Sequence, residues 1–311
     1  MRKIYFSKLK ICIILILYNT SVEAVDDSSI SNNNNTDIDN GAIITNNKQP
    51  RIIKGSSIFN AEMFPSYASI RRSGKEHFAG GVILDEYRIL TAAHSLVTKK
   101  DTIYVGGTKR DGSDKQQELK VRRFFQHPKF NSSLTNDISV IELESAITFT
   151  SKVKPVELGT EEEFENFKNG SAICQLVGHG YIARPDSVGK VLQVGNQTYT
   201  KKRSCRYYGI KSKNCFLARD ENGSQACHGD SGGPLYCNVG DAKKLFGIVS
   251  FVGSETCSEG YTGFSLPIRY EPFIKSIIER VDAQPRNESA SAKFSRALLS
   301  FMLIFIVIFI I

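Results

Sequence analysis

The chain has 311 residues and a formal charge of +8. Its basic residues form scattered pairs such as Arg71-Arg72 and Lys99-Lys100, a pattern typical of a solvated surface, although such pairs could also attract acidic glycans or anionic surfaces. No single basic motif emerges, and a secretion signal at the amino end argues further against a nucleic-acid partner.

The first 24 residues have the composition of a secretory signal peptide. Basic residues precede an apolar run over residues 11–18, and Val22-Glu23-Ala24 supplies a small-residue cleavage pattern. A membrane-spanning helix needs about 20 apolar residues, so this run is too short to be one. Cys12 lies inside the leader and is removed with it.

Residues 25–51 are rich in Asn, Asp and Ser and contain no cysteine. Such a segment buries too little apolar surface to order itself. It ends at Gln49-Pro50-Arg51, directly before the apolar pair Ile52-Ile53. We therefore expect residues 25–51 to form a segment distinct from both the signal peptide and the folded part.

Residues 52–284 are predicted to fold, and an all-β protein of this length can form one domain. Short alternating apolar runs recur between turns rich in Gly, Asn and Ser, which favours sandwiches or barrels. A helix is expected near the end, with Pro272 near its start. Its apolar face would consist of Phe273, Ile274, Ile277, Ile278 and Val281.

The folded part holds an even number of cysteines, as expected for disulfides in a secreted chain, and the sequence alone leaves their pairing open. No Cys-x-x-Cys or His-rich spacing is present, so we predict no metal site. Sequons for N-glycosylation suit a surface-displayed protein. They lie at Asn34, Asn131, Asn169, Asn196, Asn222 and Asn287.

Residues 285–311 begin with a polar stretch and end in an almost unbroken apolar run from Ala297 to Ile311. Lys293 and Arg296 fall on the side that must be lumenal, which argues against an ordinary type I anchor. Small residues, a short spacer and a hydrophobic tail favour a glycolipid attachment signal that is removed on transfer. Anchoring by the tail itself and an unanchored product are the alternatives.

The segment Gly229-Asp230-Ser231-Gly232-Gly233 places a serine among small residues, which presents its hydroxyl as a nucleophile. A serine hydroxyl needs a base and a group that orients the base. His94 follows an apolar run, and Asp137 precedes an alternating strand. Either alone has an ordinary explanation as a packed histidine or a capping aspartate. Together, in the order His, Asp, Ser, they match the chymotrypsin arrangement.

These three segments resemble the trypsin-like serine protease family, and the resemblance runs from Ile52 to about Val281. It implies an all-β fold of two packed antiparallel β-barrels with a C-terminal helix and a site in the cleft between them. It also implies a serine-type endopeptidase, a hydrolase that uses no cofactor. Ser231 would attack the scissile carbonyl, His94 would take its proton, and Asp137 would hold the imidazole tautomer.

The resemblance further implies an oxyanion hole made by the backbone N–H groups of Gly229 and Ser231. A disulfide common in the family is absent, because Ala79 and Ser95 occupy its positions, and we expect the His94 loop to be looser. The chain has no tryptophan. The implied disulfides are Cys174 with Cys237, Cys205 with Cys215, and Cys227 with Cys257.

Residues 25–51 are interpreted as an activation propeptide, because their end resembles the activation site of the family. Cleavage after Arg51 would free the α-amine of Ile52, which in the family folds inward and pairs with the aspartate beside the nucleophile, here Asp230. A buried carboxylate is unfavourable without a partner charge. We therefore expect the loop that carries Gly229 and Ser231 to adopt its active conformation only after cleavage. Lys54 stands where the family pattern has Gly, so the sequence departs from that pattern here.

The primary specificity pocket departs from that of trypsins. Trypsins carry Asp six residues before the nucleophile, whereas this chain has Gln225, so a substrate Arg or Lys would enter unpaired. Val252 and Thr262 align with the pocket walls, which resembles elastase and predicts small P1 residues. Ser250 begins the strand that pairs with the substrate backbone. An enzyme that rejects Arg needs a separate trypsin-like protease to cut after Arg51.

The other predicted partners are protein or peptide substrates and serine protease inhibitors. The main alternative function is a catalytically silent, protease-like binding protein. Such proteins usually lose a triad member, whereas this chain retains all three and the activation sequence. An enzyme that prefers esters or other acyl donors would share the same chemistry.

Overall fold

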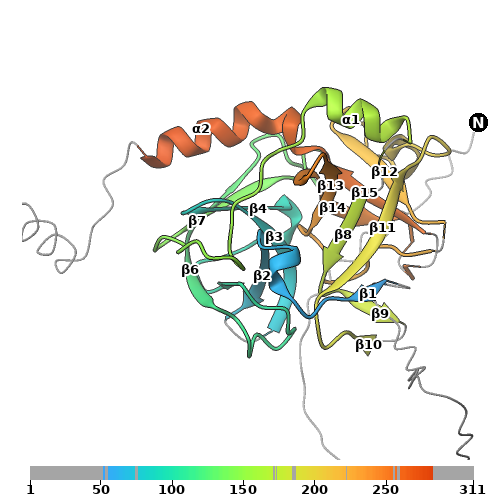
Figure 1. Ribbon diagram of the computed structural model, residues 1–311. Coiled ribbons are helices and arrows are strands. Elements are labelled where there is room, and N and C mark those ends of the chain that lie inside the picture. Colours follow the sequence, from blue (N-terminus) through green and yellow to red (C-terminus); the bar gives the residue numbers. More distant parts are fainter. Residues whose placement is uncertain are drawn as a thin grey trace, which may run out of the picture. The chain divides into compact units, whose positions relative to one another are not determined.

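The computed structural model describes residues 52, 55–73, 76–170, 172, 174–183, 187–221, 223–254, 256–257 and 260–282 (Figure 1). All of these belong to the compact unit formed by residues 48–311. The predicted signal peptide, the propeptide and the C-terminal anchor signal lie outside the described residues. In the described part of the chain, no helix is long and apolar enough to cross a membrane.

The first half of the folded part forms a closed antiparallel barrel with the strand order β2-β3-β4-β7-β6-β5 (Figure 1). Alternating apolar residues of these strands fill its interior, where Ile70, Ile83 and Ile141 are fully buried. The strands are β2 (Tyr67–Arg72), β3 (Glu76–Asp85), β4 (Arg88–Thr91), β5 (Thr102–Val105), β6 (Gln117–Gln126) and β7 (Ser139–Leu143).

The second half forms another barrel, in which the order β11-β12-β15-β14-β13-β8 is closed by pairing of β8 with β11. Two antiparallel barrels confirm the predicted fold class. The strands are β8 (Cys174–Gly178), β11 (Gln193–Tyr199), β12 (Cys215–Arg219), β13 (Pro234–Val239), β14 (Ala242–Val252) and β15 (Tyr261–Ser265). β1 (Ser56–Ser57) pairs with β11, and β9 (Tyr181–Ala183) pairs with β10 (Ser187–Val188).

In the part of the chain that the structure describes, two α-helices accompany the barrels. The predicted C-terminal helix is confirmed as α2 (Glu271–Asp282), which buries Ile274 and Ile277. The sequence analysis did not predict α1 (Glu161–Lys168), which begins at a capping box between Thr160 and Glu163. Within the described residues there are also short 3₁₀ helices: η1 (Ala61–Met63), η2 (Ala93–Ser95), η3 (Cys205–Tyr208) and η4 (Pro267–Tyr270).

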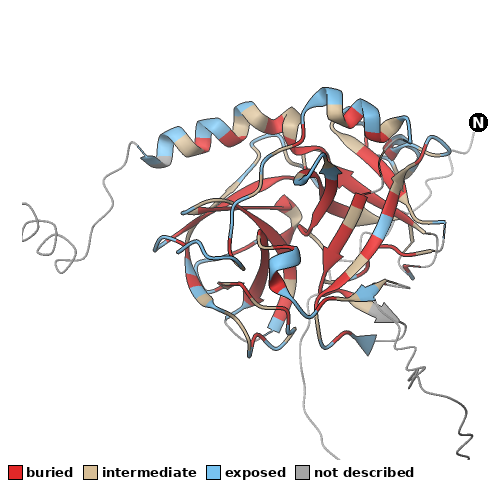
Figure 2. Ribbon diagram, in the orientation of Figure 1, coloured by how far each residue is buried: buried red, intermediate tan, exposed pale blue. Residues whose placement is uncertain are grey.

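The two barrels share a hydrophobic seam that also receives α2. Val140 of the first barrel, Ile248 of the second and Ile277 of α2 belong to one buried cluster. Figure 2 shows the buried residues concentrated along the strands of both barrels, with α2 exposed on its outer face. Burial of this seam fixes how the barrels pack, and therefore how residues from the two halves can meet.

All three disulfides lie in the second barrel, with the pairing that the family resemblance implies: Cys174–Cys237, Cys205–Cys215 and Cys227–Cys257. In the first barrel, hydrogen bonds hold the His94 loop where the family disulfide is missing. Ser139 Oγ donates to the carbonyl of Ala92 at 3.0 Å, and Gln126 Nε2 donates to the carbonyl of Ala93 at 2.9 Å. The loop is therefore fastened without a covalent bridge.

Restoring the missing bridge should stabilise the first barrel. Ala79 and Ser95 are both buried, and a disulfide that closes a loop of about 15 residues contributes about 3 kcal/mol. We expect oxidised Ala79→Cys/Ser95→Cys protein to unfold at a higher temperature than the same variant after reduction, with the single variant Ala79→Cys as control. A bridge that forms without raising the unfolding temperature would show that the hydrogen bonds already supply the constraint.

Candidate active site

His94 and Asp137 are in direct contact, although 42 residues separate them in the sequence. His94 lies in the short helix η2 after β4, and Asp137 lies two residues before the start of β7. Asp137 Oδ2 lies 2.7 Å from His94 Nδ1, and Asp137 Oδ1 accepts a 2.9 Å hydrogen bond from the His94 backbone N–H. One carboxylate therefore fixes both the ring and the main chain of the histidine.

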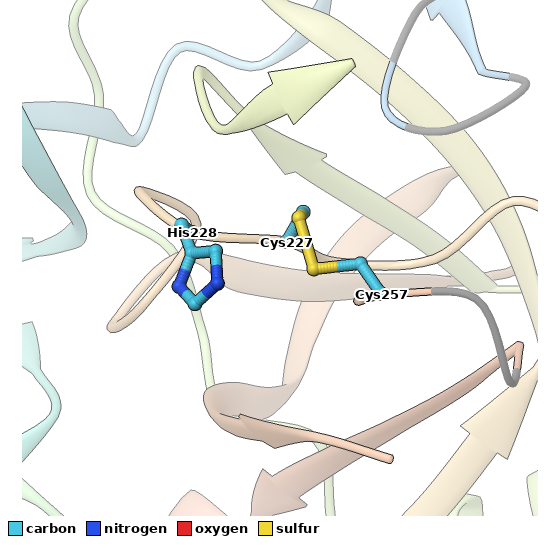
Figure 3. Close-up of side chains that lie close together, drawn as sticks. All are labelled: Cys227, His228 and Cys257. Carbon is cyan, nitrogen blue, oxygen red and sulfur yellow. A yellow bond between two sulfur atoms is a disulfide. The ribbon is translucent and has the colours of Figure 1, made fainter. Parts of the chain in front are cut away.

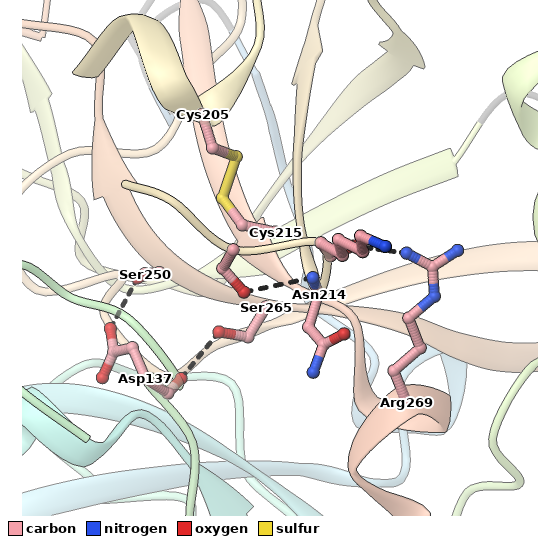
Figure 4. The surroundings of a disulfide bond; sticks show 9 residues. Asp137, Cys205, Asn214, Cys215, Ser250, Ser265 and Arg269 are labelled. Carbon is pink, nitrogen blue, oxygen red and sulfur yellow. Dashed lines mark hydrogen bonds between the residues drawn. A yellow bond between two sulfur atoms is a disulfide. The ribbon is translucent and has the colours of Figure 1, made fainter. Parts of the chain in front are cut away.

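Asp137 is fully buried, and donors from the second barrel also satisfy it. Figure 4 shows Ser250 Oγ pointing at the carboxylate, to which it donates at 2.6 Å, and Ser265 Oγ donating to the Asp137 carbonyl at 2.8 Å. Ser250 belongs to β14 and Ser265 to β15. Asp137 therefore links the two barrels at the point where it holds His94.

The electrostatic environment of His94 favours its charged form. Burial alone would lower the pKa of the ring, but the negative charge of Asp137 and its hydrogen bond together outweigh burial, so the pKa lies above the ordinary value of 6.5. Because Nδ1 faces the acceptor oxygen of Asp137, the neutral ring carries its proton there and leaves Nε2 as an acceptor. A histidine in this state can act as a general base.

The loop that carries Ser231 contacts both barrels. The Ser231 carbonyl accepts from Gly80 N–H of β3 at 2.8 Å, and Gly232 N–H donates to Val249 O of β14 at 2.8 Å. Gly232 has φ of 75° and lies against the segment before His94, since a Cβ atom there would come within 3.0 Å of Ala92 N. The structure thus brings the Ser231 loop against the His94 loop.

Asp230, beside Ser231, is also fully buried. Its two carboxylate oxygens accept hydrogen bonds from Gly180 N–H at 2.7 Å and Cys227 N–H at 2.9 Å. Burial nevertheless raises the pKa of Asp230 to about 6. Ile52, the residue after the predicted cleavage site, is fully buried in the core of the second barrel. Arg51 lies outside the described residues.

The predicted pocket residues lie together in the second barrel. Gln225 is 2% exposed, and its neighbour Ala226 donates its N–H to Thr262 Oγ1 at 3.0 Å. Val252 is half-buried and pairs with Thr262 across β14 and β15. Thr262 is fully buried, and its hydroxyl oxygen accepts this hydrogen bond from the residue next to Gln225.

One cluster near this pocket has the residue types of a metal site. Figure 3 shows Cys227, His228 and Cys257, whose ligand atoms lie within 4.8 Å of one another. The two sulfur atoms are joined in a disulfide and therefore offer no thiolate ligand. Only the exposed imidazole of His228 remains as a donor in this group.

Some residues that hold the candidate active site together were not predicted from the sequence. Ser250 was expected only to pair with substrate backbone, but its hydroxyl also holds Asp137. His77 reaches the Gly229 carbonyl through Nε2 at 2.9 Å and is paired with Ser69 at 2.8 Å. These contacts join positions that are remote in the sequence, and no local pattern around any of them distinguishes it from an ordinary polar residue.

Comparison with known proteins agrees with this arrangement. The family model described as Trypsin matches residues 52–274. Trypsin 5G1 of Aedes aegypti is 29% identical over 219 residues, which cover 68% of this chain and 79% of that protein. The chain therefore belongs to the trypsin family of serine proteases.

The contact between His94 and Asp137 predicts how the histidine titrates. In Asp137→Asn the opposing charge is lost while burial stays, so the pKa of His94 should fall below its wild-type value. NMR titration of the His94 ring proton, assigned with a His94→Gln variant, measures this. In Ser250→Ala the charge on Asp137 remains, and the pKa should stay above 6.5. An unchanged pKa in Asp137→Asn would contradict the electrostatic coupling.

Proposed function

We propose that this protein is a serine endopeptidase, made as a zymogen and either secreted or attached to the outer cell surface. The observation that carries the proposal is the buried Asp137 carboxylate, which accepts hydrogen bonds from both the ring and the backbone of His94. Membership of the trypsin family supports the same chemistry. A silent binding protein would not need a buried charge that orients an imidazole.

In the proposed mechanism, His94 removes the proton of Ser231 Oγ as the oxygen attacks the scissile carbonyl. Asp137 stabilises the imidazolium that forms, and His94 then protonates the leaving amine. The backbone N–H groups of Gly229 and Ser231 form the oxyanion hole, whose individual donors contribute roughly 3 to 4 kcal/mol of barrier lowering. The φ of 95° at Gly229 supports this role, because a side chain there would strain the loop.

Activation is proposed to follow cleavage after Arg51. The new ammonium of Ile52 would supply a partner charge for buried Asp230, whose pKa burial raises to about 6. The burial of Ile52 in the second barrel supports an inward position for this residue. Pairing would then hold the loop that carries Gly229 and Ser231.

Substrates are proposed to be proteins or peptides with a small residue at P1. Gln225 is buried at the expected base of the pocket and carries no charge to pair with Arg or Lys. Val252 and Thr262 are adjacent, as expected for two side chains that narrow one pocket. A separate trypsin-like protease is therefore required for cleavage after Arg51, and serine protease inhibitors are expected to bind the mature enzyme.

The location rests on the sequence of the two ends. The signal peptide and the glycolipid attachment signal are proposed to place the enzyme outside the cell or on its outer surface. Three of the sequons, at Asn131, Asn169 and Asn196, are exposed in the structure, as glycan attachment requires.

A fluorophosphonate probe tests the nucleophile directly. Protein cut after Arg51 should be labelled at Ser231, and Ser231→Ala should lose labelling together with roughly 10⁶-fold in kcat, because the triad acts as one unit. Ser187→Ala, which removes an exposed serine, is the matched control. Labelling that persists in folded Ser231→Ala protein would overturn the assignment, and absence of any labelling in cut wild type would favour the silent binding protein.

Self-activation tests the pocket. Purified full-length protein should stay intact at Arg51, and added trypsin should convert it. Gln225→Asp supplies a buried carboxylate at the pocket base and should allow cleavage after Arg, measured by mass spectrometry of the new amino terminus. Efficient self-conversion of wild type, absent in Ser231→Ala, would contradict the proposed specificity while leaving the catalytic assignment intact.

A further inference from the structure

Arg110 contacts the backbone of two residues, His179 and His77, near the loop that carries Asp230 and Ser231 (the nucleophile loop). The side chain belongs to the connection between β5 and β6 and is half-buried. Its Nη1 donates to the carbonyl of His179, and its Nη2 lies 3.5 Å from the carbonyl of His77. In the sequence, Arg110 belongs to the basic pair Lys109-Arg110, a pattern that does not indicate these contacts.

The first contact reaches Asp230 through a single peptide unit. The carbonyl of the His179–Gly180 peptide accepts from Arg110, and the N–H of the same peptide donates to Asp230 Oδ1 at 2.7 Å. Hydrogen bonds at the two ends of one peptide polarise each other and become stronger. The guanidinium of Arg110 therefore strengthens the hydrogen bond from the Gly180 N–H to the buried carboxylate of Asp230.

The second contact reaches Gly229, the predicted oxyanion residue. His77 Nε2 donates to the Gly229 carbonyl at 2.9 Å, and His77 Nδ1 accepts from Ser69 Oγ at 2.8 Å. Burial lowers the pKa of His77 well below its ordinary value, and the neighbouring His179 and the charge of Arg110 lower it further. The ring is therefore neutral, with Nε2 as its donor and Nδ1 as its acceptor.

The position of Arg110 is itself fixed by backbone contacts. Its carbonyl accepts from Arg71 Nη1 at 2.6 Å, and its N–H donates to Lys190 O at 2.9 Å. The charge of Arg110 lowers the pKa of Asp230, against the larger effect of burial. Arg110 thus acts on Asp230 through its charge and through the shared His179–Gly180 peptide.

We propose that Arg110 is a positioning residue that keeps Asp230 and the nucleophile loop in their working arrangement before cleavage after Arg51, which gives the uncut chain a basal activity. This inference rests on the proposed serine protease function, because it concerns the regulation of the same nucleophile. After cleavage, the ammonium of Ile52 adds a second partner charge. Arg110 then matters much less.

The test compares uncut and cut protein. The uncut form carries Arg51→Gln, and the cut form is wild type treated with trypsin; the readout is the rate of fluorophosphonate labelling. Uncut protein should label slowly, and Arg110→Met should reduce that rate about tenfold, while the cut form should lose less than about threefold. Arg110→Lys keeps the charge and should restore most of the uncut rate. Lys109→Met, a change at the exposed neighbour, should alter neither form.

Three outcomes would overturn the inference: no labelling of uncut protein when the cut form labels, an uncut rate unaffected by Arg110→Met, or equal losses in both forms. Equal losses would mean that Arg110 only supports the fold, and thermal unfolding of each variant checks this. Failure of cut wild type to label would instead reject the proposed function, and this inference with it.

Discussion

The site depends on one buried carboxylate, that of Asp137. A carboxylate without solvent is stable only when donors surround it, and the donors here come from both barrels: the ring and backbone of His94, and the hydroxyl of Ser250. The hydrophobic seam between the barrels must form for these groups to meet. His94 and Asp137 both belong to the first barrel, and packing of the second barrel against it brings Ser250 to the same carboxylate.

A second buried carboxylate, Asp230, lies beside Ser231, the proposed nucleophile. It accepts two backbone N–H groups, yet burial still leaves its pKa at about 6. The two aspartates thus differ in their use. Asp137 accepts hydrogen bonds from side chains of both barrels, whereas Asp230 accepts only backbone N–H groups among the hydrogen bonds of the described residues, and we propose the loop beside Ser231 as the point of control. The contacts of Arg110 and the proposed ammonium of Ile52 act on the carboxylate of Asp230.

The sequence predicted the fold class, the C-terminal helix and the segments that bring His94 and Asp137 together, because apolar alternation and the triad motifs are local patterns. It missed α1, although Thr160 and Glu163 have the spacing of a capping box. It could not predict the hydroxyl of Ser250 on Asp137, or Arg110 behind the loop. Such contacts depend on where remote loops come to lie, which no periodicity encodes.

The most direct measurement is the tautomer of neutral His94, read from its ring ¹⁵N chemical shifts above its pKa. The contact with Asp137 predicts a proton on Nδ1, donated to the carboxylate, and an unprotonated Nε2 that can act as the base. A proton on Nε2 in the folded protein would contradict it, because Asp137 would then not orient the ring for proton transfer from Ser231.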